Sequence, residues 1–461
     1  MLSNYKIASS THSRFYSREM LGLIFRICIP SLLLSSSIFG NDLPVLFNHL
    51  TVDDGLSQNS AHAILEDSQG FMWFGTRFGL SRYDGVHFKT FLADPLDSKS
   101  IPGYWITCLA EDHDGVMWVG TRGAGLGRYN RETESFANYM PNTVDANSLP
   151  HSTVTALYTD SDGMLWVATE FGLSRYNKHT STFINFFHNP DSTNTLPSNR
   201  ITALTEMPGR KLCVGTENGG LVSLSLDDFS IENMLSARKS TSIQVKSILA
   251  DSTNNALWVA RFGSALYKFD IGNSEWSVCQ PKDLRTIQLL DGAVSISQDS
   301  NGIIWLASVL GLVAFDPHSE KYEIFQNDPF EPRSLGDNLL YQVYIDRQGI
   351  IWLGTESAGI SYYDPNLIRF TQNRHEPGNP NSILNNMVFS VAEDNTGNIW
   401  FGTMGGGTSV MDPTTGEFRH FNSIGINFGW SRDYVSRVLM DRSQKVWIGT
   451  ASCGIFVLDY P

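Results

Sequence analysis

The chain has 461 residues, of which 41% are hydrophobic and 17% are charged, a composition typical of globular proteins rather than disordered ones. The net charge is −14, from 33 Lys and Arg against 47 Asp and Glu, and an acidic chain without a basic run is a poor partner for nucleic-acid phosphates. The five cysteines are sparse and form no CxxC pair, so neither a zinc site nor a disulfide framework is predicted.

The first forty residues differ from the rest of the chain. Basic residues up to Arg18 precede two apolar segments, 21–25 and 27–40. A basic region followed by a short apolar run is the layout of a secretory signal, and the run is shorter and more interrupted than a typical membrane span. We therefore predict that residues 1–40 are a signal peptide or a membrane anchor, and that the rest of the chain works outside the cytoplasm.

After this leader, one sequence unit repeats nine times. A tryptophan, replaced once by cysteine, returns in the same setting at intervals of 45 to 48 residues. A period of this size indicates propeller blades or a solenoid. The nine positions are Trp73, Trp118, Trp166, Cys213, Trp258, Trp305, Trp352, Trp400 and Trp447.

The third copy displays the unit most clearly. Four short segments with β-strand character, separated by turns rich in Gly and Asp, lie at 154–160, 164–169, 173–176 and 183–187. No segment has a convincing helical period of apolar residues, which argues against helical repeats. The sequence therefore predicts an all-β fold, a β-propeller of four-stranded blades.

An aspartate precedes most of the tryptophans by six residues, and a glycine usually follows that aspartate by three. The carboxylate is expected to accept backbone N–H groups in a tight turn, where Gly supplies a positive φ. The Asp160–Gly163 segment would also suit calcium, but most copies lack the further acidic ligands, so no metal is predicted. The tryptophans are expected to pack blade against blade and not to stack on a ligand.

The repeat resembles that of the two-component regulator propeller family. The clearest copies, 56–83, 116–129 and 350–363, read LSQNSAHAILEDSQGFMWFGTRFGLSRY, VMWVGTRGAGLGRY and IIWLGTESAGISYY. The resemblance extends over about residues 45–459. It implies a periplasmic ligand-binding sensor region of a bacterial transmembrane receptor, with ligands that are often oligosaccharides. Such receptors typically carry fourteen repeats in two seven-bladed propellers, followed by a β-sandwich, a membrane helix and a histidine kinase or diguanylate cyclase.

The resemblance suggests three parts in this chain. We expect a leader at 1–40, a seven-bladed β-propeller at 41–366, and the first two blades of a truncated second propeller at 367–461. A lone strand at 45–51 would complete the seventh blade. A single ring of eight or nine blades is the alternative. No kinase or cyclase motif is present, so the chain is interpreted as the front part of a receptor, attached to the membrane only through its leader or a missing C-terminal part. The receptor could form a homodimer.

Charged and aromatic residues recur where blade loops are expected to meet at one end of the ring, and converging loops form pockets. Mixed charges with a few aromatic rings suit a small polar ligand, uncharged or zwitterionic, such as a carbohydrate. The predicted ligand-binding residues lie in two kinds of segment. In the turns between the second and third strands of a blade they are Arg77, Arg122, Glu170, Glu217, Arg261 and Glu356. In the loops before the first, inner strand of a blade they are Tyr104, Trp105 and Tyr341. Asn199, Arg200 and Asn338 lie in the same segments.

No catalytic motif, such as G-x-S-x-G, H-E-x-x-H or a phosphate loop, is present. We therefore predict neither catalytic residues nor a cofactor. One alternative is a propeller enzyme resembling streptogramin lyase, which uses a histidine base and a bound metal; His151 is then the candidate. Another is a propeller that binds protein partners. The remaining histidines, including His62, show no metal spacing and are expected in surface or turn positions.

Overall fold

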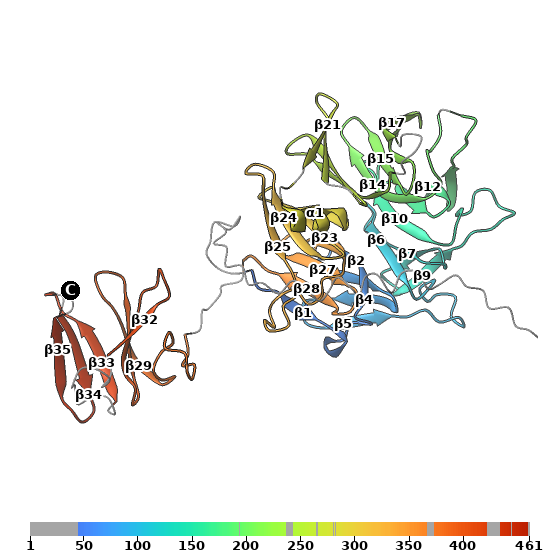
Figure 1. Ribbon diagram of the computed structural model, residues 1–461. Helices are drawn as coiled ribbons and strands as arrows, with labels where there is room; N and C mark the ends of the chain where they lie inside the picture. Colours follow the sequence, from blue (N-terminus) through green and yellow to red (C-terminus); the bar gives the residue numbers. More distant parts are fainter. Residues whose placement is uncertain are drawn as a thin grey trace, which may run out of the picture. The chain divides into compact units, whose positions relative to one another are not determined.

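The structure is a computed structural model that describes residues 45–459, except 193, 237–242, 264–265, 280, 282, 367–372, 422–433 and 444. The chain divides into two compact units, Met1–Asn366 and Leu367–Pro461 (Figure 1). The predicted leader, 1–40, lies outside the described residues, as do residues 367–372 at the start of the predicted second propeller. Each unit is considered by itself.

The described chain folds into nine antiparallel sheets, eight of four strands and one of three. The third sheet consists of β10 (Val154–Thr159), β11 (Leu165–Thr169), β12 (Gly172–Asn177) and β13 (Thr182–Phe186), paired in that order. These bounds differ from the predicted strands by one residue at most. The all-β fold predicted from the repeat is thus confirmed.

The other sheets repeat this order. The first sheet consists of β2 (Ala61–Glu66), β3 (Met72–Thr76), β4 (Gly79–Tyr83) and β5 (Phe88–Phe91), and the second of β6 (Ile106–Glu111), β7 (Met117–Thr121), β8 (Leu126–Asn130) and β9 (Ser135–Tyr139). The fourth consists of β14 (Ile201–Met207), β15 (Lys211–Thr216), β16 (Gly220–Ser225) and β17 (Ile231–Ser236), and the fifth of β18 (Val245–Asp251), β19 (Ala256–Arg261), β20 (Leu266–Asp270) and β21 (Glu275–Cys279). The sixth consists of β22 (Ala293–Gln298), β23 (Ile304–Ser308), β24 (Gly311–Asp316) and β25 (Lys321–Phe325).

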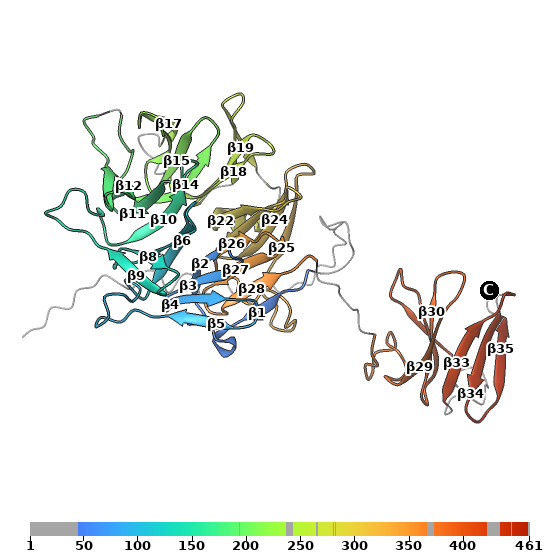
Figure 2. The ribbon, with the colours of Figure 1, turned by 180° about the vertical axis from the view of Figure 1, so that it is seen from behind.

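The seventh sheet joins the two ends of the first unit. It contains β26 (Leu340–Ile345), β27 (Ile351–Thr355), β28 (Ile360–Tyr363) and the early strand β1 (Asn48–Leu50), which pairs antiparallel with β28. A short 3-10 helix, Val52–Asp54, follows β1. The inner strands, β2, β6, β10, β14, β18, β22 and β26, contact one another in chain order. β2 also contacts β26 and β27, and it lies beside β27 in both views (Figures 1 and 2).

The second unit contains two sheets. One consists of β29 (Val388–Glu393), β30 (Ile399–Thr403), β31 (Gly407–Met411) and β32 (Phe418–Phe421), and the other of β33 (Val435–Met440), β34 (Lys445–Thr450) and β35 (Ile455–Asp459). Their inner strands, β29 and β33, are in contact.

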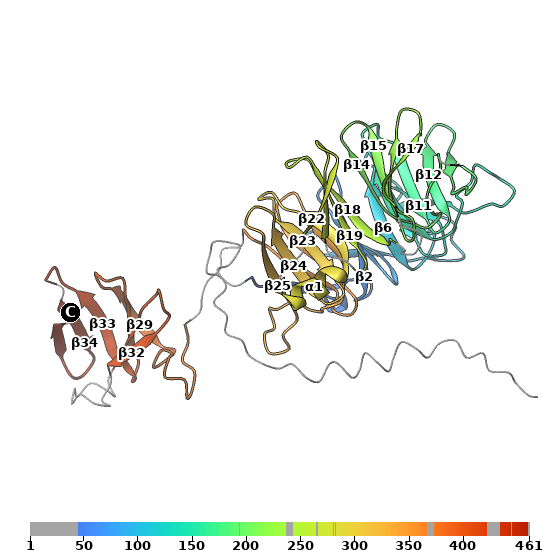
Figure 3. The same cartoon turned by 45° about the horizontal axis from the view of Figure 1, so that its top comes forward.

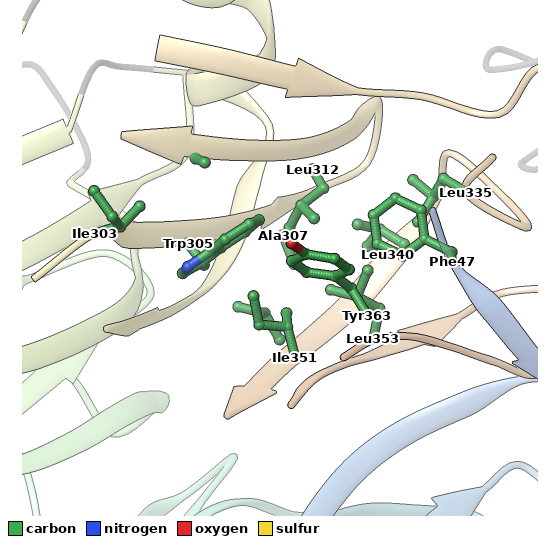
Figure 4. Packing of buried hydrophobic residues seen from close by; sticks show 12 residues of the cluster. Phe47, Ile303, Trp305, Ala307, Leu312, Leu335, Leu340, Ile351, Leu353 and Tyr363 are labelled. Carbon is green, nitrogen blue, oxygen red and sulfur yellow. The ribbon is translucent and has the colours of Figure 1, made fainter. Parts of the chain in front are cut away.

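Hydrophobic side chains fill the space between successive sheets. In one cluster, Trp305 of the sixth sheet packs with Leu340 and Leu353 of the seventh, while Phe47, just before β1, packs beside Tyr363 (Figure 4). Trp166 lies fully buried against the next sheet in the same way. The predicted packing of the tryptophans, blade against blade, is therefore what the structure contains.

The spacing of six residues between Asp and Trp has a second physical reason. Oδ1 of Asp160 accepts the backbone N–H groups of Asp162 and Met164, as expected for a turn, whereas Oδ2 accepts the indole N–H of Trp166 at 2.7 Å. The same bond to the indole occurs at all eight repeat tryptophans. One carboxylate thus fixes both the turn and the ring that packs against the next sheet.

The sequence analysis predicts no helix, but α1 (Leu284–Asp291) precedes the sixth sheet and packs on β23 and β24 (Figure 3). The carboxylate of Asp283 caps it by accepting the N–H of Thr286 at 2.8 Å, and Leu289 and Leu290 bury its inner side. In the part of the chain that the structure describes, no helix has the length and apolar character needed to cross a membrane.

Candidate functional site

The turn between the second and third strands often reads G-T-x-x-G, as at 75–79 in the first sheet, and it places a side chain at the same end of each sheet. The buried hydroxyl of Thr76, at the end of β3, donates to the carbonyl oxygen of Gly79 at 3.0 Å. The next residue, Arg77, donates its backbone N–H to the carbonyl of Ser60, just before β2. Equivalent backbone bonds hold Arg122 to Trp105, Glu170 to Thr153, Glu217 to Arg200 and Glu356 to Leu339. The turn residues are therefore fixed beside the segment that enters each inner strand.

Arg261 departs from this pattern, and its predicted place in the turn is wrong by one residue. It lies three residues after Trp258, inside β19, where most other sheets have the buried threonine. Phe262 takes the turn position and donates its N–H to the carbonyl of Gln244 at 3.1 Å. The guanidinium of Arg261 lies over the ring of Tyr267, 4.8 Å from its centre. Arg261 carries a charge like the turn residues of the other sheets, but its distance from the repeat tryptophan is one residue shorter than theirs.

Each inner strand also carries a β-bulge at its second residue. In three successive sheets this residue is a threonine whose hydroxyl donates to a carbonyl of the next inner strand: Thr107 to Val154, Thr155 to Ile201 and Thr202 to Val245, at 2.6 to 2.7 Å. In β2 and β26 the bulge residues are instead His62 and Tyr341. Bulges re-aim side chains and are frequent beside functional sites.

These two residues meet between the first and seventh sheets, in what we call the His62 cluster: His62, Arg77, Tyr341 and Glu356. The rings of His62 and Tyr341 stack at 3.9 Å. The Arg77 guanidinium donates to Glu356 Oε2 at 2.8 Å, to the Tyr341 hydroxyl at 3.0 Å and to His62 Nε2 at 3.2 Å. The Tyr341 hydroxyl also donates to Glu356.

The protonation states in the His62 cluster follow from this geometry. Burial, together with the positive charge of Arg77, lowers the pKa of His62 to about 4, although Glu356 opposes the shift. The bond from Arg77 agrees, because an Nε2 that accepts a hydrogen bond carries no proton. Burial, and then the bond to Glu356, raise the pKa of Tyr341 to about 12. Near neutral pH the imidazole and phenol are thus uncharged, and Arg77 is paired with Glu356.

Beside the cluster lies a groove of about 590 Å³, lined by Arg77, by much of the connection 93–105, by the turn 122–124 and by Asn138. We call it the Trp105 groove, because the indole of Trp105 lies near both arginines. The guanidinium carbons of Arg122 and Arg77 are 4.4 and 5.0 Å from the ring centre.

Two exposed aromatic rings stand next to this groove. Tyr104, which lines it, stacks on Phe78 with ring centres 5.1 Å apart and planes within 8°. The two residues keep 42% and 50% of their surface exposed. A flat aromatic pair that remains in contact with water offers a surface on which a ligand ring could stack.

The wall formed by the connection 93–105 is held by its own hydrogen bonds. The Ser100 hydroxyl accepts the N–H of Asp94, and the Asn138 amide donates to the Ser100 carbonyl at 3.0 Å. A Cβ on Gly103 would lie only 2.5 Å from that of Ala124, so glycine permits the close approach to the turn. The groove is therefore preformed, and little ordering would accompany binding.

A second charged set lies on the third and fourth sheets. The Arg200 guanidinium is 2.6 Å from Glu217 and 3.6 Å from Glu170, and the Gln244 amide donates to Glu217. The single guanidinium thus offsets only one of the two carboxylate charges.

The structure therefore divides the predicted binding residues. One set of contacts joins Arg77, Trp105, Arg122, Tyr341 and Glu356, and Tyr104 lies at the rim of this set. A separate set of contacts contains Glu170 and Glu217. His62 and Phe78 are not among the residues predicted from the sequence. Aligning the bulge position across repeats would have matched His62 with Tyr341.

Among the described residues, no group of three or more His, Cys, Asp and Glu side chains could hold a metal ion. His151, the candidate base of the lyase alternative, accepts the N–H of Thr153 through Nδ1 at 3.0 Å.

Five segments of the chain match the family model of the two component regulator propeller: 55–78, 100–123, 148–171, 334–357 and 382–405. The chain thus carries repeats of the two-component regulator propeller. The first two matched segments contain Arg77 and Arg122, so this propeller protein carries its groove residues within the repeat itself. Over 68 residues it is 41% identical to Histidine kinase P4 of Formosa agariphila, covering 15% of this chain and 5% of that protein.

Solved structures resemble the propeller protein over more of its length. The extracellular domain described as that of the hybrid two component system BT3049 from B. thetaiotaomicron has a TM-score of 0.67 and 28% identity, over 90% of this chain and 53% of that one. The extracellular domain of the one component system BT4673 from the same organism has 0.59 and 21%, over 90% and 59%. This chain thus spans little more than half of either.

Virginiamycin B lyase from Staphylococcus aureus is also similar, with a TM-score of 0.52 and 13% identity over 70% of this chain and 99% of that one. At this identity the likeness concerns the fold alone and assigns no catalytic residue.

Proposed function

We propose that this chain is the extracytoplasmic ligand-binding sensor part of a bacterial signal-transduction receptor, and that it binds a carbohydrate or another small polar molecule. The observation that carries the proposal is the Trp105 groove with its adjoining His62 cluster. The family repeats and the likeness to the BT3049 extracellular domain support a position outside the cytoplasm, reached through a leader at 1–40. Output by a histidine kinase or a cyclase would belong to another part of the receptor.

We further infer that the seven sheets of residues 41–366 form one closed propeller and that 367–461 begins a second. The pairing of β1 with β28 and the contact of β2 with β26 support closure after seven sheets. The division of the chain after Asn366 supports the same grouping. Closure also brings the first and seventh sheets together, and this is where the His62 cluster lies.

The groove suits a saccharide for two reasons. The stacked rings of Tyr104 and Phe78 can cover the apolar C–H face of a sugar ring, as aromatic side chains do in polar ligand sites. Asp94 and the backbone of the connection can then bond hydroxyl groups. Because the walls are preformed, such bonds would not be offset by a large ordering cost.

Isothermal titration of the purified full chain with a panel of neutral and acidic oligosaccharides tests this proposal. Tyr104→Ala should weaken binding about tenfold, equivalent to about 1.4 kcal/mol, because it removes one stacking surface. The control is Phe171→Ala, which removes an exposed aromatic residue from the turn of the third sheet that corresponds to the turn of Phe78. If Tyr104→Ala binds as the wild type does, or if Phe171→Ala loses as much, the ligand does not occupy this groove.

A further inference from the structure

The charge of the Trp105 groove points to a more specific ligand. Arg77 is paired with Glu356, and Arg200, which precedes β14 in the fourth sheet, is paired with Glu217. The exposed Arg122, in contrast, forms no ion pair with any residue that the structure describes. Its guanidinium instead lies over Trp105, 4.4 Å from the ring centre. Arg122 therefore brings a positive charge without an ion-pair partner to the groove, on a chain whose net charge is −14.

The position of Arg122 leaves its hydrogen-bond donors available. An arginine on an aromatic face is held by cation–π attraction, which uses the flat face of the guanidinium and not its N–H groups. The backbone N–H of Arg122 is fixed to the Trp105 carbonyl at 2.9 Å, so the start of the side chain is fixed as well. Such a fork matches the two oxygens of a carboxylate.

The rest of the groove limits how much negative charge a ligand can carry. Asp94 and Asp97 also line it, and Oδ1 of each is bonded to backbone N–H groups of the connection, those of Leu96 and Lys99, at 2.9 Å. Like charges repel, so a continuous polyanion or a densely sulfated chain would be disfavoured beside these carboxylates. A ligand with one acid group at Arg122 and neutral, hydroxyl-rich units around it fits the groove better than such a polyanion.

We propose that the Trp105 groove binds an oligosaccharide that bears an isolated uronic acid, whose carboxylate pairs with Arg122 while a neutral sugar ring stacks on Tyr104. This inference rests on the proposed function and deepens it. Arg122 acts here as the specificity-determining residue, because it separates acidic saccharides from neutral ones with the same backbone.

The experiment uses the full chain and matched saccharide pairs in calorimetric titrations at low salt. Each pair has one neutral backbone, such as xylotetraose or cellotetraose, with and without a single glucuronic acid branch; tetragalacturonate and a sulfated disaccharide serve as polyanionic probes. The branched member of at least one pair should bind roughly tenfold more tightly than its neutral partner, the effect of one charge-assisted interaction. Both polyanionic probes should bind less tightly than that branched member, and 0.5 M NaCl should reduce the preference.

Arg122→Gln should reduce that preference to less than twofold and leave the affinity for the neutral partner unchanged, whereas the control Glu217→Gln should keep the preference. Equal binding within every pair, tighter binding of a polyanionic probe, or a loss in Arg122→Gln that affects both members alike would overturn the inference while the proposed saccharide site stands. If no saccharide in the panel binds, the proposed function fails as well.

Discussion

His62 is an ordinary residue in the printed sequence and a central one in the structure. Its neighbours in β2, Ala61 and Ala63, are buried between sheets, and the bulge between them directs the imidazole toward Arg77 and Tyr341. The imidazole is held in its neutral form by burial and by the adjacent guanidinium. A half-buried histidine of this kind links stability to pH.

The first prediction concerns this link. The pKa of His62 is about 4 in the folded chain against 6.5 for an unperturbed histidine. Between these values the unfolded chain binds a proton that the folded chain does not, so the free energy of unfolding should be fully retained above pH 6.5 and should fall as the pH drops from 6.5 to 4. His62→Gln should flatten this part of the curve. Thermal melts across that range provide the measurement.

The control for this measurement is His179→Gln, which changes an exposed histidine and should keep the slope of the wild type. If the His62→Gln curve is as steep as the wild-type curve between pH 6.5 and 4, His62 is not held neutral.

At the scale of the strand, the bulge of each inner strand offers a position with two uses. In β6, β10 and β14 a threonine hydroxyl at this position links neighbouring inner strands. In β2 and β26 the same position supplies the stacked rings of the His62 cluster. One backbone irregularity thus serves structure in some sheets and a polar site in others.

The second prediction separates these uses. Thr155→Val keeps the shape of the side chain but removes its bond to the carbonyl of Ile201, 2.7 Å away. The loss should destabilise the chain by about 1 kcal/mol, the net value of one neutral hydrogen bond. Denaturant unfolding measures this cost, and saccharide affinity should stay unchanged. Weakened binding without loss of stability would show that this position also serves the site.

How far the sequence predicted the structure depends on what each pattern encodes. Alternating residues and Gly- and Asp-containing turns are local, and they located β10 to β13 within one residue. The eight-residue helix α1 is too short for its period to stand out. The His62 cluster depends on contact between residues nearly three hundred positions apart, which no local pattern reports. Arg261 was misplaced because its charge, and not its distance from Trp258, was matched to the other turns.

At the scale of the whole molecule, the two units differ in how well their sheets are covered. In the first unit Trp73 is completely buried against the next sheet, whereas Trp447 in the last sheet is 40% exposed. Ile455 and Val457 on β35 are exposed too, as are Phe389 and Val391 on β29. Exposed apolar strands and unpaired sheet edges favour association.

The third prediction follows from this difference. A chain ending at Asn366 should remain folded and should stay monomeric at concentrations at which the 461-residue chain associates, because the exposed apolar sheets are gone. Sedimentation velocity over a concentration series tests this. Unfolding of the shortened chain, seen by circular dichroism, would contradict the inferred seven-sheet propeller.

The pairing of β1 with β28 has a consequence for biogenesis. A polypeptide secreted N-terminus first delivers residues 48–50 long before 360–363 emerge, so their sheet cannot form until almost the whole first unit has crossed. Contacts this distant in sequence are slow to form, because a long loop must first close. If the chain is exported as we propose, it therefore holds an unsatisfied strand during translocation, and chaperones outside the cytoplasm would encounter it in that state.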